Sequence, residues 1–398
     1  MPGFELFGDL ERKEVNDVLD NGVIMRYGFD GMRNGHWKAK ELERKLSETF
    51  QSNHVQLVSS GTAAVSIALA AAGVGAGDEV ILPTFTFVAS FEAVMMLGAV
   101  PVLVDIDDTL TLSPKAIEDA ITPKTKAVMV VHMCGSMGNM EALQNICAAN
   151  KLLLVEDACQ AIGGSYKGKP LGSIGDLGCF SFDFVKTITC GEGGAVITNN
   201  EEYYINSDHF SDHGHDHIGN DRGAETHPFL GYNFRISELH AAVGLGQLKR
   251  LPEIIDIQKR NFNIIKDVLA TIPEVTFRTV PEGGEESYGF LNFFLSDLNT
   301  ARKVSNEFKT QGIDGCFHYY DNNWHYVRKW EHLKELKSLY PISEEVKSGL
   351  AYLKNADYSE SDHFIGRNLS CLIKLSWTEE TVRQRALKMA EIIKSIID

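Results

Sequence analysis

Residues 55–64, VQLVSSGTAA, run from a short apolar segment directly into a helix start. Residues 55–59 have the Val and Leu content of a buried strand, and residues 61–72 have the length of a crossover helix. A strand that leads into a helix without a linker is typical of α/β sheets whose strands are mainly parallel. The junction therefore predicts this fold class and a ligand site where the strands end.

The same alternation continues to about residue 200. We expect further buried strands at 79–82, 100–104, 127–131, 152–155 and 195–198, with helices at 87–97, 114–121 and 140–150 between them. Two long helices, at 237–251 and 252–272, then lead into strands expected at 275–280, 289–295, 315–319 and 371–375 and a closing helix at 379–397. This change in the pattern of helices and strands predicts a large α/β domain over residues 1–251, and a linking helix with a small α+β domain over 252–398.

Composition narrows the functional class. The 398 residues include 38 Lys and Arg against 54 Asp and Glu, a net charge of −16 that argues against a nucleic-acid partner. The most apolar stretch, residues 65–77, is too short to span a bilayer, and the N-terminus has acids instead of the apolar core of a signal peptide. Seven scattered cysteines without a Cys-x-x-Cys pair predict neither a disulfide framework nor a cysteine-rich metal site. We expect a reduced, cytoplasmic protein that does not bind membranes.

Three short motifs that follow expected strands could carry chemistry. Residues 59–64 place free backbone amides at a helix start, which suits an anion, although an ordinary capped helix is the simpler explanation of this motif alone. Asp157, in EDACQ at 156–160, either faces a ligand or caps a helix. Lys186 stands alone among apolar residues, where an amine either forms a Schiff base with an aldehyde or reaches solvent at the rim of the sheet.

An anion seat, an acid and an isolated amine in this order are what pyridoxal 5′-phosphate requires of a protein. With these motifs, the chain resembles the DegT/DnrJ-type sugar aminotransferases, which have the type I, aspartate-aminotransferase-like fold. The resemblance covers essentially the whole chain and rests on SGTA at 60–63, PTFTFVA at 83–89, EDACQ at 156–160, FSF at 180–182 with Lys186, GEGG at 191–194 and GYNFR at 231–235. It implies a mainly parallel sheet of the seven-stranded type, a smaller C-terminal α+β domain, and pyridoxal 5′-phosphate as the cofactor.

The resemblance also implies a role for each matching residue. Lys186 is expected to bind the cofactor aldehyde and to shuttle a proton, and Asp157 to pair with the pyridinium nitrogen. Other cofactor contacts are expected from Gln160 near the ring hydroxyl, Phe87 on the ring face, and Gly61, Thr62 and Ser181 at the phosphate. Asn233 is expected to reach the phosphate from a neighbouring subunit, which implies a homodimer with shared active sites.

A narrower resemblance concerns the substrate. The stretches at 26–34, 131–137, 186–190, 210–217 and 322–326 are similar to the branch of the family that makes 8-amino-3,8-dideoxy-manno-octulosonate. This implies transfer of an amino group from glutamate to the terminal aldehyde of an oxidised 3-deoxy-manno-octulosonate, for lipopolysaccharide. A free sugar acid needs cations and hydrogen bonds, for which the candidates are Arg26, Arg33, His213, His215, His318 and Arg235. The alternative acceptor is a nucleotide-linked 4-keto-6-deoxy sugar, as in many members of the wider family.

The same residues are compatible with other sites and functions. The histidines of residues 209–217 have no recognised ligand spacing, so we expect no metal there but a polar loop that reaches the active-site mouth or a partner subunit. The aromatic residues of 317–326 either line a sugar pocket or form the edge of the small-domain core. Lys186 and the absence of a cysteine cluster argue against a sugar dehydratase. A non-catalytic regulator that binds the cofactor and a metal hydrolase are more remote alternatives.

Overall fold

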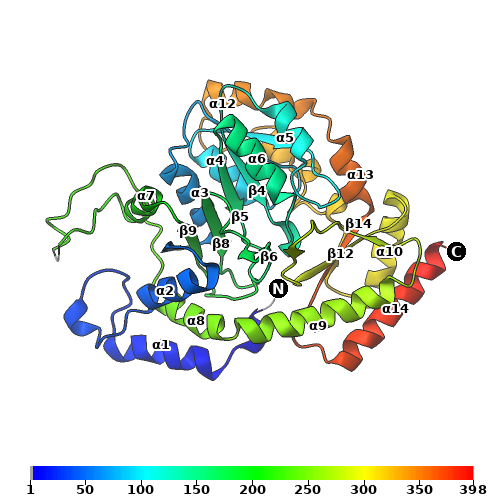
Figure 1. Ribbon diagram of the computed structural model, residues 1–398, viewed down its shortest axis with the longest axis horizontal. Coiled ribbons are helices and arrows are strands. Elements are labelled where there is room, and N and C mark those ends of the chain that lie inside the picture. Colours follow the sequence, from blue (N-terminus) through cyan, green and yellow to red (C-terminus); the bar gives the residue numbers. More distant parts are fainter. Residues whose placement is uncertain (1–2, 220, 398) are drawn as a thin grey trace.

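A computed structural model describes residues 3–219 and 221–397, and its centre is a seven-stranded sheet (Figure 1). The strand order is β1 (His54–Val58), β9 (Gly194–Thr198), β8 (Leu177–Ser181), β5 (Leu153–Asp157), β4 (Thr125–Val131), β2 (Glu79–Pro83) and β3 (Val100–Val104). β9 is antiparallel to both of its neighbours, and the pairs among β8, β5, β4, β2 and β3 are parallel. The expected α/β fold with a mainly parallel sheet is confirmed.

Helices cover both faces of this sheet. One face packs on α3 (Gly61–Ala71) and α4 (Val88–Met96), and the other on α2 (Lys38–Phe50), α5 (Pro114–Ala120), α6 (Met140–Asn150) and α8 (Glu238–Lys249). The ends are flanked by α1 (Asp9–Asn21), α7 (Glu201–Ser211) and the short 3₁₀ helices η1 (Gly3–Leu6), η2 (Asp30–Met32) and η3 (Met133–Gly135). α3 is apolar on nearly every side because it is buried between the sheet and its neighbouring helices.

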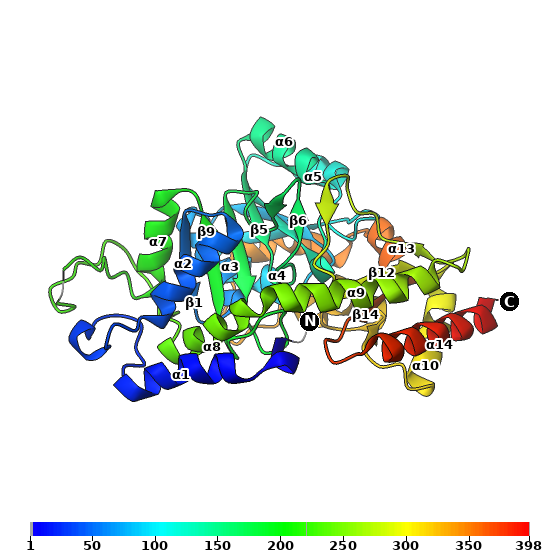
Figure 2. The same ribbon diagram turned by 60° about the horizontal axis from the view of Figure 1, so that its bottom comes forward.

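A second, antiparallel sheet follows in the C-terminal part, with the order β10 (Thr276–Phe277), β12 (Phe290–Phe294), β14 (Asn368–Leu372) and β13 (Cys316–Phe317). It packs on α9 (Leu251–Leu269), α10 (Leu298–Thr310) and α14 (Glu379–Ile397), which share a separate apolar core. α9 continues from α8 and packs on α14; it lies below the large sheet in Figure 1 and in front of it in Figure 2. A small third sheet joins β11 (Gly284–Glu285), β6 (Ser165–Tyr166) and β7 (Lys169–Pro170).

The stretch between β13 and β14 returns to the first sheet. It contains η4 (Tyr319–Asp321), η5 (Val327–Lys329), α11 (Glu331–Lys334), α12 (Glu344–Gly349), η6 (Ala351–Lys354) and α13 (Ser359–Arg367). Tyr326, Trp330 and Leu350 from this stretch are buried in the same core as α3 and α4. The division at residues 251 and 252 stays a prediction, because the C-terminal part both builds its own core and completes the core of the first sheet.

Three sequence expectations differ from the structure. β14 begins at Asn368, three residues before the expected start at 371, because buried polar Asn368 and Ser370 hide its apolar alternation. β8 was not expected as a strand, since Gly178 and Ser181 weaken its apolar pattern. No disulfide was expected, but Cys316 and Cys371, 55 residues apart, form one because antiparallel pairing of β13 with β14 places them opposite each other.

Within the described residues, no helix is both long and apolar enough to cross a membrane.

Candidate active site

A cavity of about 970 Å³ lies where strands of the first sheet end, with a wall from the C-terminal part. Residues that follow β1, β2, β4, β5 and β8 reach it, as expected for an open α/β sheet. The structure brings together at this cavity the residues expected to bind the cofactor within one chain: Gly61, Thr62, Phe87, Asp157, Gln160, Ser181 and Lys186.

One end of the cavity is built to receive an anion. The first turn of α3 leaves the N–H groups of Gly61 and Thr62 without intrahelical acceptors, and the positive end of the helix dipole lies there. Ser60 caps the helix, since its Oγ accepts a hydrogen bond from the Ala63 N–H at 3.1 Å. A Cβ atom on Gly61 would lie only 2.6 Å from the Cβ of Ser181, so glycine lets the helix start approach β8. These groups fit a phosphate.

A second part of the cavity holds a fixed carboxylate. Asp157 is buried, and its Oδ2 accepts a hydrogen bond from Ser90 Oγ at 2.7 Å while its Oδ1 accepts one from the Cys159 N–H at 3.2 Å. Ser90 in turn hydrogen-bonds Thr86 Oγ1 at 2.7 Å. Both oxygens of Asp157 are therefore held in place, which suits pairing with a protonated ring nitrogen. Ser90 was missed by the sequence reasoning because nothing in the sequence places it near Asp157.

The lysine lies in the turn after β8. Its backbone N–H donates to the Asp183 carbonyl at 3.0 Å, and Cys190 N–H closes the turn by donating to the Phe182 carbonyl at 2.8 Å. The half-buried side chain of Lys186 has no hydrogen bond or ion pair with any residue that the structure describes. A primary amine without a partner, in one cavity with an anion seat and a carboxylate, fits an aldehyde cofactor that carries a phosphate and a ring nitrogen.

Behind the cavity, a buried pair joins two strand ends. Glu156 accepts hydrogen bonds from the N–H groups of Gly172, Ile174 and Gly175 at 2.8, 2.6 and 2.6 Å, and it pairs with His132 Nε2 at 2.8 Å. Successive residues of a strand face opposite sides, so this bonding directs the Asp157 side chain to the cavity. Glu156 thus supports the site without lining it.

The aromatic stretch supplies the wall opposite the sheet. Phe317, Tyr319, Trp324 and His325 line the cavity, whereas Tyr326 is buried in the core of the first sheet. The stretch therefore lines the cavity, and Tyr326 packs in the core of the first sheet instead of at the edge of the small-domain core. Burial and the nearby Lys186 ammonium lower the pKa of His325 to about 4.

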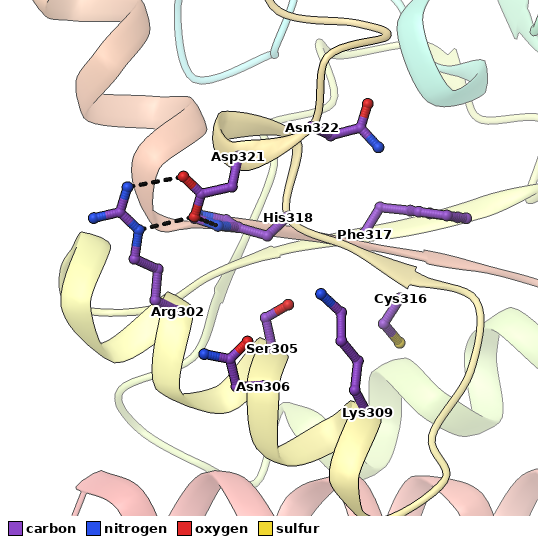
Figure 3. A pocket seen from close by; sticks show the side chains of 9 residues that line it. All are labelled: Arg302, Ser305, Asn306, Lys309, Cys316, Phe317, His318, Asp321 and Asn322. Carbon is purple, nitrogen blue, oxygen red and sulfur yellow. Dashed lines mark hydrogen bonds and ion pairs between the residues drawn. The ribbon is translucent and has the colours of Figure 1, made fainter. Parts of the chain in front are cut away.

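His318 does not reach the main cavity. It borders a smaller hollow of about 270 Å³ beside α10, which Figure 3 shows with Arg302, Lys309 and Asp321. His318 Nδ1 pairs with Asp321 at 3.1 Å, and its Nε2 donates to the Gly366 carbonyl at 2.8 Å. Both ring nitrogens are thus occupied by the protein, and burial lowers the pKa of His318. The position after β13 thus places His318 outside the cavity that holds the expected cofactor residues, and its role with the substrate stays a prediction.

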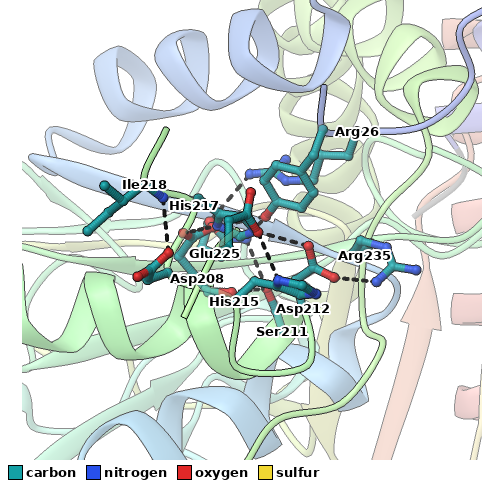
Figure 4. Close-up of polar contacts among 12 residues, drawn as sticks. Arg26, Asp208, Ser211, Asp212, His215, His217, Ile218, Glu225 and Arg235 are labelled. Carbon is teal, nitrogen blue, oxygen red and sulfur yellow. Dashed lines mark hydrogen bonds and ion pairs between the residues drawn. The ribbon is translucent and has the colours of Figure 1, made fainter. Parts of the chain in front are cut away.

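Of the other expected substrate cations, Arg235 belongs to an ionic network centred on Asp212, which lies outside the cavity (Figure 4). Asp212 pairs with Arg235, with Arg222 at 2.8 Å and with His217 Nε2 at 2.9 Å. The other ring nitrogen, His217 Nδ1, pairs with Asp208 at 2.6 Å. These contacts tie the loop after α7 to α7 itself and to the segment before α8.

Arg26, Arg33, His213, His215 and Asn233 do not line the cavity of their own chain either. Buried Arg26 pairs with Glu43, and buried Arg33 donates to the carbonyls of Met25 and Gly28. His215 Nδ1 lies 2.8 Å from Glu225, while His213 and Asn233 are exposed on the loop surface. We expected these cations to bind the substrate. Within the chain, however, Arg26, His215 and Arg235 lie beside carboxylates, and Arg33 donates hydrogen bonds to backbone carbonyls. The described residues include no group of three or more His, Cys, Asp or Glu placed to hold a metal ion.

The network predicts a pH-dependent stability. Asp208 and Asp212 raise the pKa of His217 to about 9, so its charge stabilises the fold fully below its ordinary pKa of 6.5 and not above about 9. His217→Gln should therefore lower the free energy of unfolding by on the order of 2 kcal/mol near pH 6, with the difference shrinking towards pH 9.5. Denaturant unfolding across this pH range measures the difference in the free energy of unfolding. Exposed His363→Gln is the control, and a pH-independent difference for His217→Gln would contradict the prediction.

Comparison with known proteins agrees with this site. The model of the DegT/DnrJ/EryC1/StrS aminotransferase family matches residues 8–362. A GDP-perosamine synthase of Escherichia coli O157:H7 is 40% identical over 309 residues, which cover 74% of this chain and 81% of that protein. One from Vibrio cholerae is 32% identical over 344 residues, covering 84% of this chain and 87% of that protein.

Solved structures share the whole fold. An aminotransferase from Psychrobacter cryohalolentis is 25% identical, with a TM-score of 0.84 over 98% of both chains. A sugar aminotransferase from Streptococcus pneumoniae, described in its PLP form, has the same fold with a TM-score of 0.82 over 98% of both chains at 24% identity. The chain belongs to the DegT/DnrJ/EryC1/StrS family and is a sugar aminotransferase that depends on pyridoxal 5′-phosphate.

Proposed function

We propose that this enzyme transfers an amino group from glutamate to the terminal aldehyde of an oxidised 3-deoxy-manno-octulosonate, for modified lipopolysaccharide sugar synthesis. One observation carries the choice of acceptor: the stretch 322–326, part of the narrower sequence resemblance, contributes Asn322, Trp324 and His325 to the cavity wall. Aromatic faces and polar side chains in this wall suit a polyhydroxylated chain that enters with its reactive end towards Lys186.

We propose cofactor roles for residues that line the cavity. When bound, pyridoxal 5′-phosphate supplies an aldehyde that takes up and releases the amino group, and a ring that accepts electrons. Gly61, Thr62 and Ser181 would hold its phosphate, and Phe87 would cover the ring, with Gln160 beside the ring hydroxyl. Asp157 would keep the ring nitrogen protonated. The Lys186 amine would hold the aldehyde and then move a proton at the carbon that gains or loses nitrogen.

The second candidate is an aminotransferase for a nucleotide-linked 4-keto-6-deoxy sugar. The relatives named as GDP-perosamine synthases favour it, since their name states a sugar joined to a nucleotide. The two candidates share the first half of the reaction and differ only in the acceptor. Family membership favours transamination over dehydration or a purely regulatory role for either acceptor.

We further propose that the active enzyme is a homodimer in which Asn233 completes the partner's site. Asn233 is exposed, and near it the loop presents Tyr232 at 55% exposure and Leu230 at 90%. Exposed apolar residues of this kind mark interaction surfaces. The ionic network around Asp212 would keep this loop in position for the partner.

The role of Asp157 is tested by Asp157→Asn, which keeps its shape but removes its charge. We expect turnover to fall on the order of 10²-fold or more, as when one preorganised electrostatic group is lost. Steady-state kinetics with glutamate measure the turnover. Asp119→Asn, on the exposed face of α5, is the matched control. A near-normal rate would limit Asp157 to holding the turn after β5 through its hydrogen bond from the Cys159 N–H.

The shared site is tested by mixing two impaired variants, Lys186→Ala and Asn233→Ala. Each hybrid dimer would contain one site with both native residues, so activity should return to about half of the wild-type value per hybrid dimer, or about a quarter for an equimolar mixture in which half of the dimers are hybrids, a rough estimate from subunit statistics. Subunit exchange is followed independently with differently tagged chains. No recovery despite exchange would place Asn233 in its own chain's site or outside any site.

The acceptor is tested in single half-reactions. Glutamate is added to the holoenzyme until the visible absorbance of the lysine-bound cofactor is lost, and excess glutamate is then removed. We expect the absorbance to return with the octulosonate aldehyde, because the amino group then leaves the enzyme. Return with only a nucleotide-linked keto sugar would replace the proposed acceptor by the second candidate.

A further inference from the structure

His325 belongs to a segment whose backbone is fixed independently of its side chain. Its carbonyl accepts a hydrogen bond from the Thr86 N–H at 3.0 Å, and Val327 N–H donates to the Thr84 carbonyl at 3.2 Å. An isolated β-bridge also pairs Phe85 with Tyr326. The segment is thereby attached to the loop after β2, which carries Phe87. Replacing the imidazole leaves all of these backbone contacts in place.

The ring itself is held between aromatic groups and lacks a polar partner. Its centroid lies 5.5 Å from that of Phe87 and 4.9 Å from that of Tyr319. Its Nδ1 atom is buried and accepts or donates no hydrogen bond among the described residues. Buried polar atoms are normally paired, and an unpaired one destabilises the protein until a ligand or water meets it. His318, nearby in the chain, has both ring nitrogens occupied and contrasts with it.

The charge state of the ring restricts what it can bind. Because burial and the Lys186 ammonium hold the pKa of His325 near 4, the imidazole is neutral at pH 7. A neutral imidazole donates through one nitrogen and accepts through the other. Sugar hydroxyls do both, whereas the carboxylates of glutamate accept only and favour cations. The ring is therefore suited to a hydroxyl-bearing acceptor.

We propose that His325 is a specificity-determining residue that hydrogen-bonds a hydroxyl of the acceptor sugar beside its reacting carbonyl. The proposal rests on the proposed function, in that it needs a polyhydroxylated carbonyl compound as the acceptor. His325 would orient the reacting carbon towards Lys186 and would leave the reaction with glutamate largely unaffected.

The test uses His325→Phe, which keeps an aromatic ring without nitrogens, and His325→Asn, which restores a polar atom near the Nδ1 position. His332→Phe, at an exposed residue of α11, is the control. The absorbance of the holoenzyme follows each half-reaction separately. In His325→Phe we expect kcat/KM for the acceptor to fall about 10- to 100-fold, as when a polar site loses its partner, with the glutamate half-reaction within about 3-fold. His325→Asn should recover part of the loss.

A binding measurement provides a readout that does not depend on turnover. Unoxidised 3-deoxy-manno-octulosonate carries an alcohol in place of the terminal aldehyde, and the holoenzyme with lysine-bound cofactor has no amino group to transfer, so this compound can bind to it without being aminated. Calorimetry should show weaker binding to His325→Phe by about the same factor as the loss in kcat/KM. Equal losses in both half-reactions, or no loss in either, would overturn the proposal.

The outcome for His325 is separable from that for the acceptor. If wild-type enzyme aminates only a nucleotide-linked keto sugar, the octulosonate assignment fails, and the same variants are compared with that sugar. The same selective loss is then expected, since that acceptor also carries hydroxyls beside its carbonyl. Amination of neither compound would overturn both proposals.

Discussion

The close approach of α3 to the ends of β8 and β9 is the constraint on which the cofactor site depends. A Cβ atom on Gly61 would lie 2.6 Å from Ser181, and one on Gly194 would lie 2.3 Å from the Ser60 carbonyl oxygen. Glycine lets the helix start approach the Ser181 side chain at position 61 and the backbone of Ser60 approach β9 at position 194, so the helix start and the end of β8 share one cavity. The turn after β8 then carries Lys186 into the same space.

The cavity has two walls with different origins. Groups that fit the cofactor follow the strands of the first sheet, whereas the aromatic groups of the opposite wall come from a stretch that leaves the second sheet and returns to the first. Backbone hydrogen bonds from Thr86 and Val327 join the two walls near Phe87. The division explains how one fold can keep its cofactor chemistry while the acceptor varies with the opposite wall.

Local pattern predicted most strands and crossover helices of the first sheet, and the family resemblance supplied the residues expected to bind the cofactor. The apolar strands and crossover helices are readable because parallel strands are buried on both faces, and the motifs follow those strands directly. The residues expected to bind a ligand at the strand ends, which range from Gly61 to Lys186 along the chain, could therefore be predicted from the sequence. The partners that orient them were not. Ser90 reaches Asp157 from another helix, and His132 reaches Glu156 from another strand, so no short sequence window contains either pair.

Residue type alone did not indicate which cations already have carboxylate partners in their own chain. From residue type, the candidates for binding an anionic substrate include Arg26, Arg235 and His215. In the folded chain, Glu43 lies beside Arg26, Asp212 beside Arg235, and Glu225 beside His215. Antiparallel pairing likewise made a disulfide of two cysteines that share no sequence signal. By itself the sequence determined the α/β fold and the chemistry of the cofactor site, because both arise from local pattern. Only the tertiary structure decided which charges remain free and which nitrogen lacks a partner, because pairing depends on contacts between distant segments.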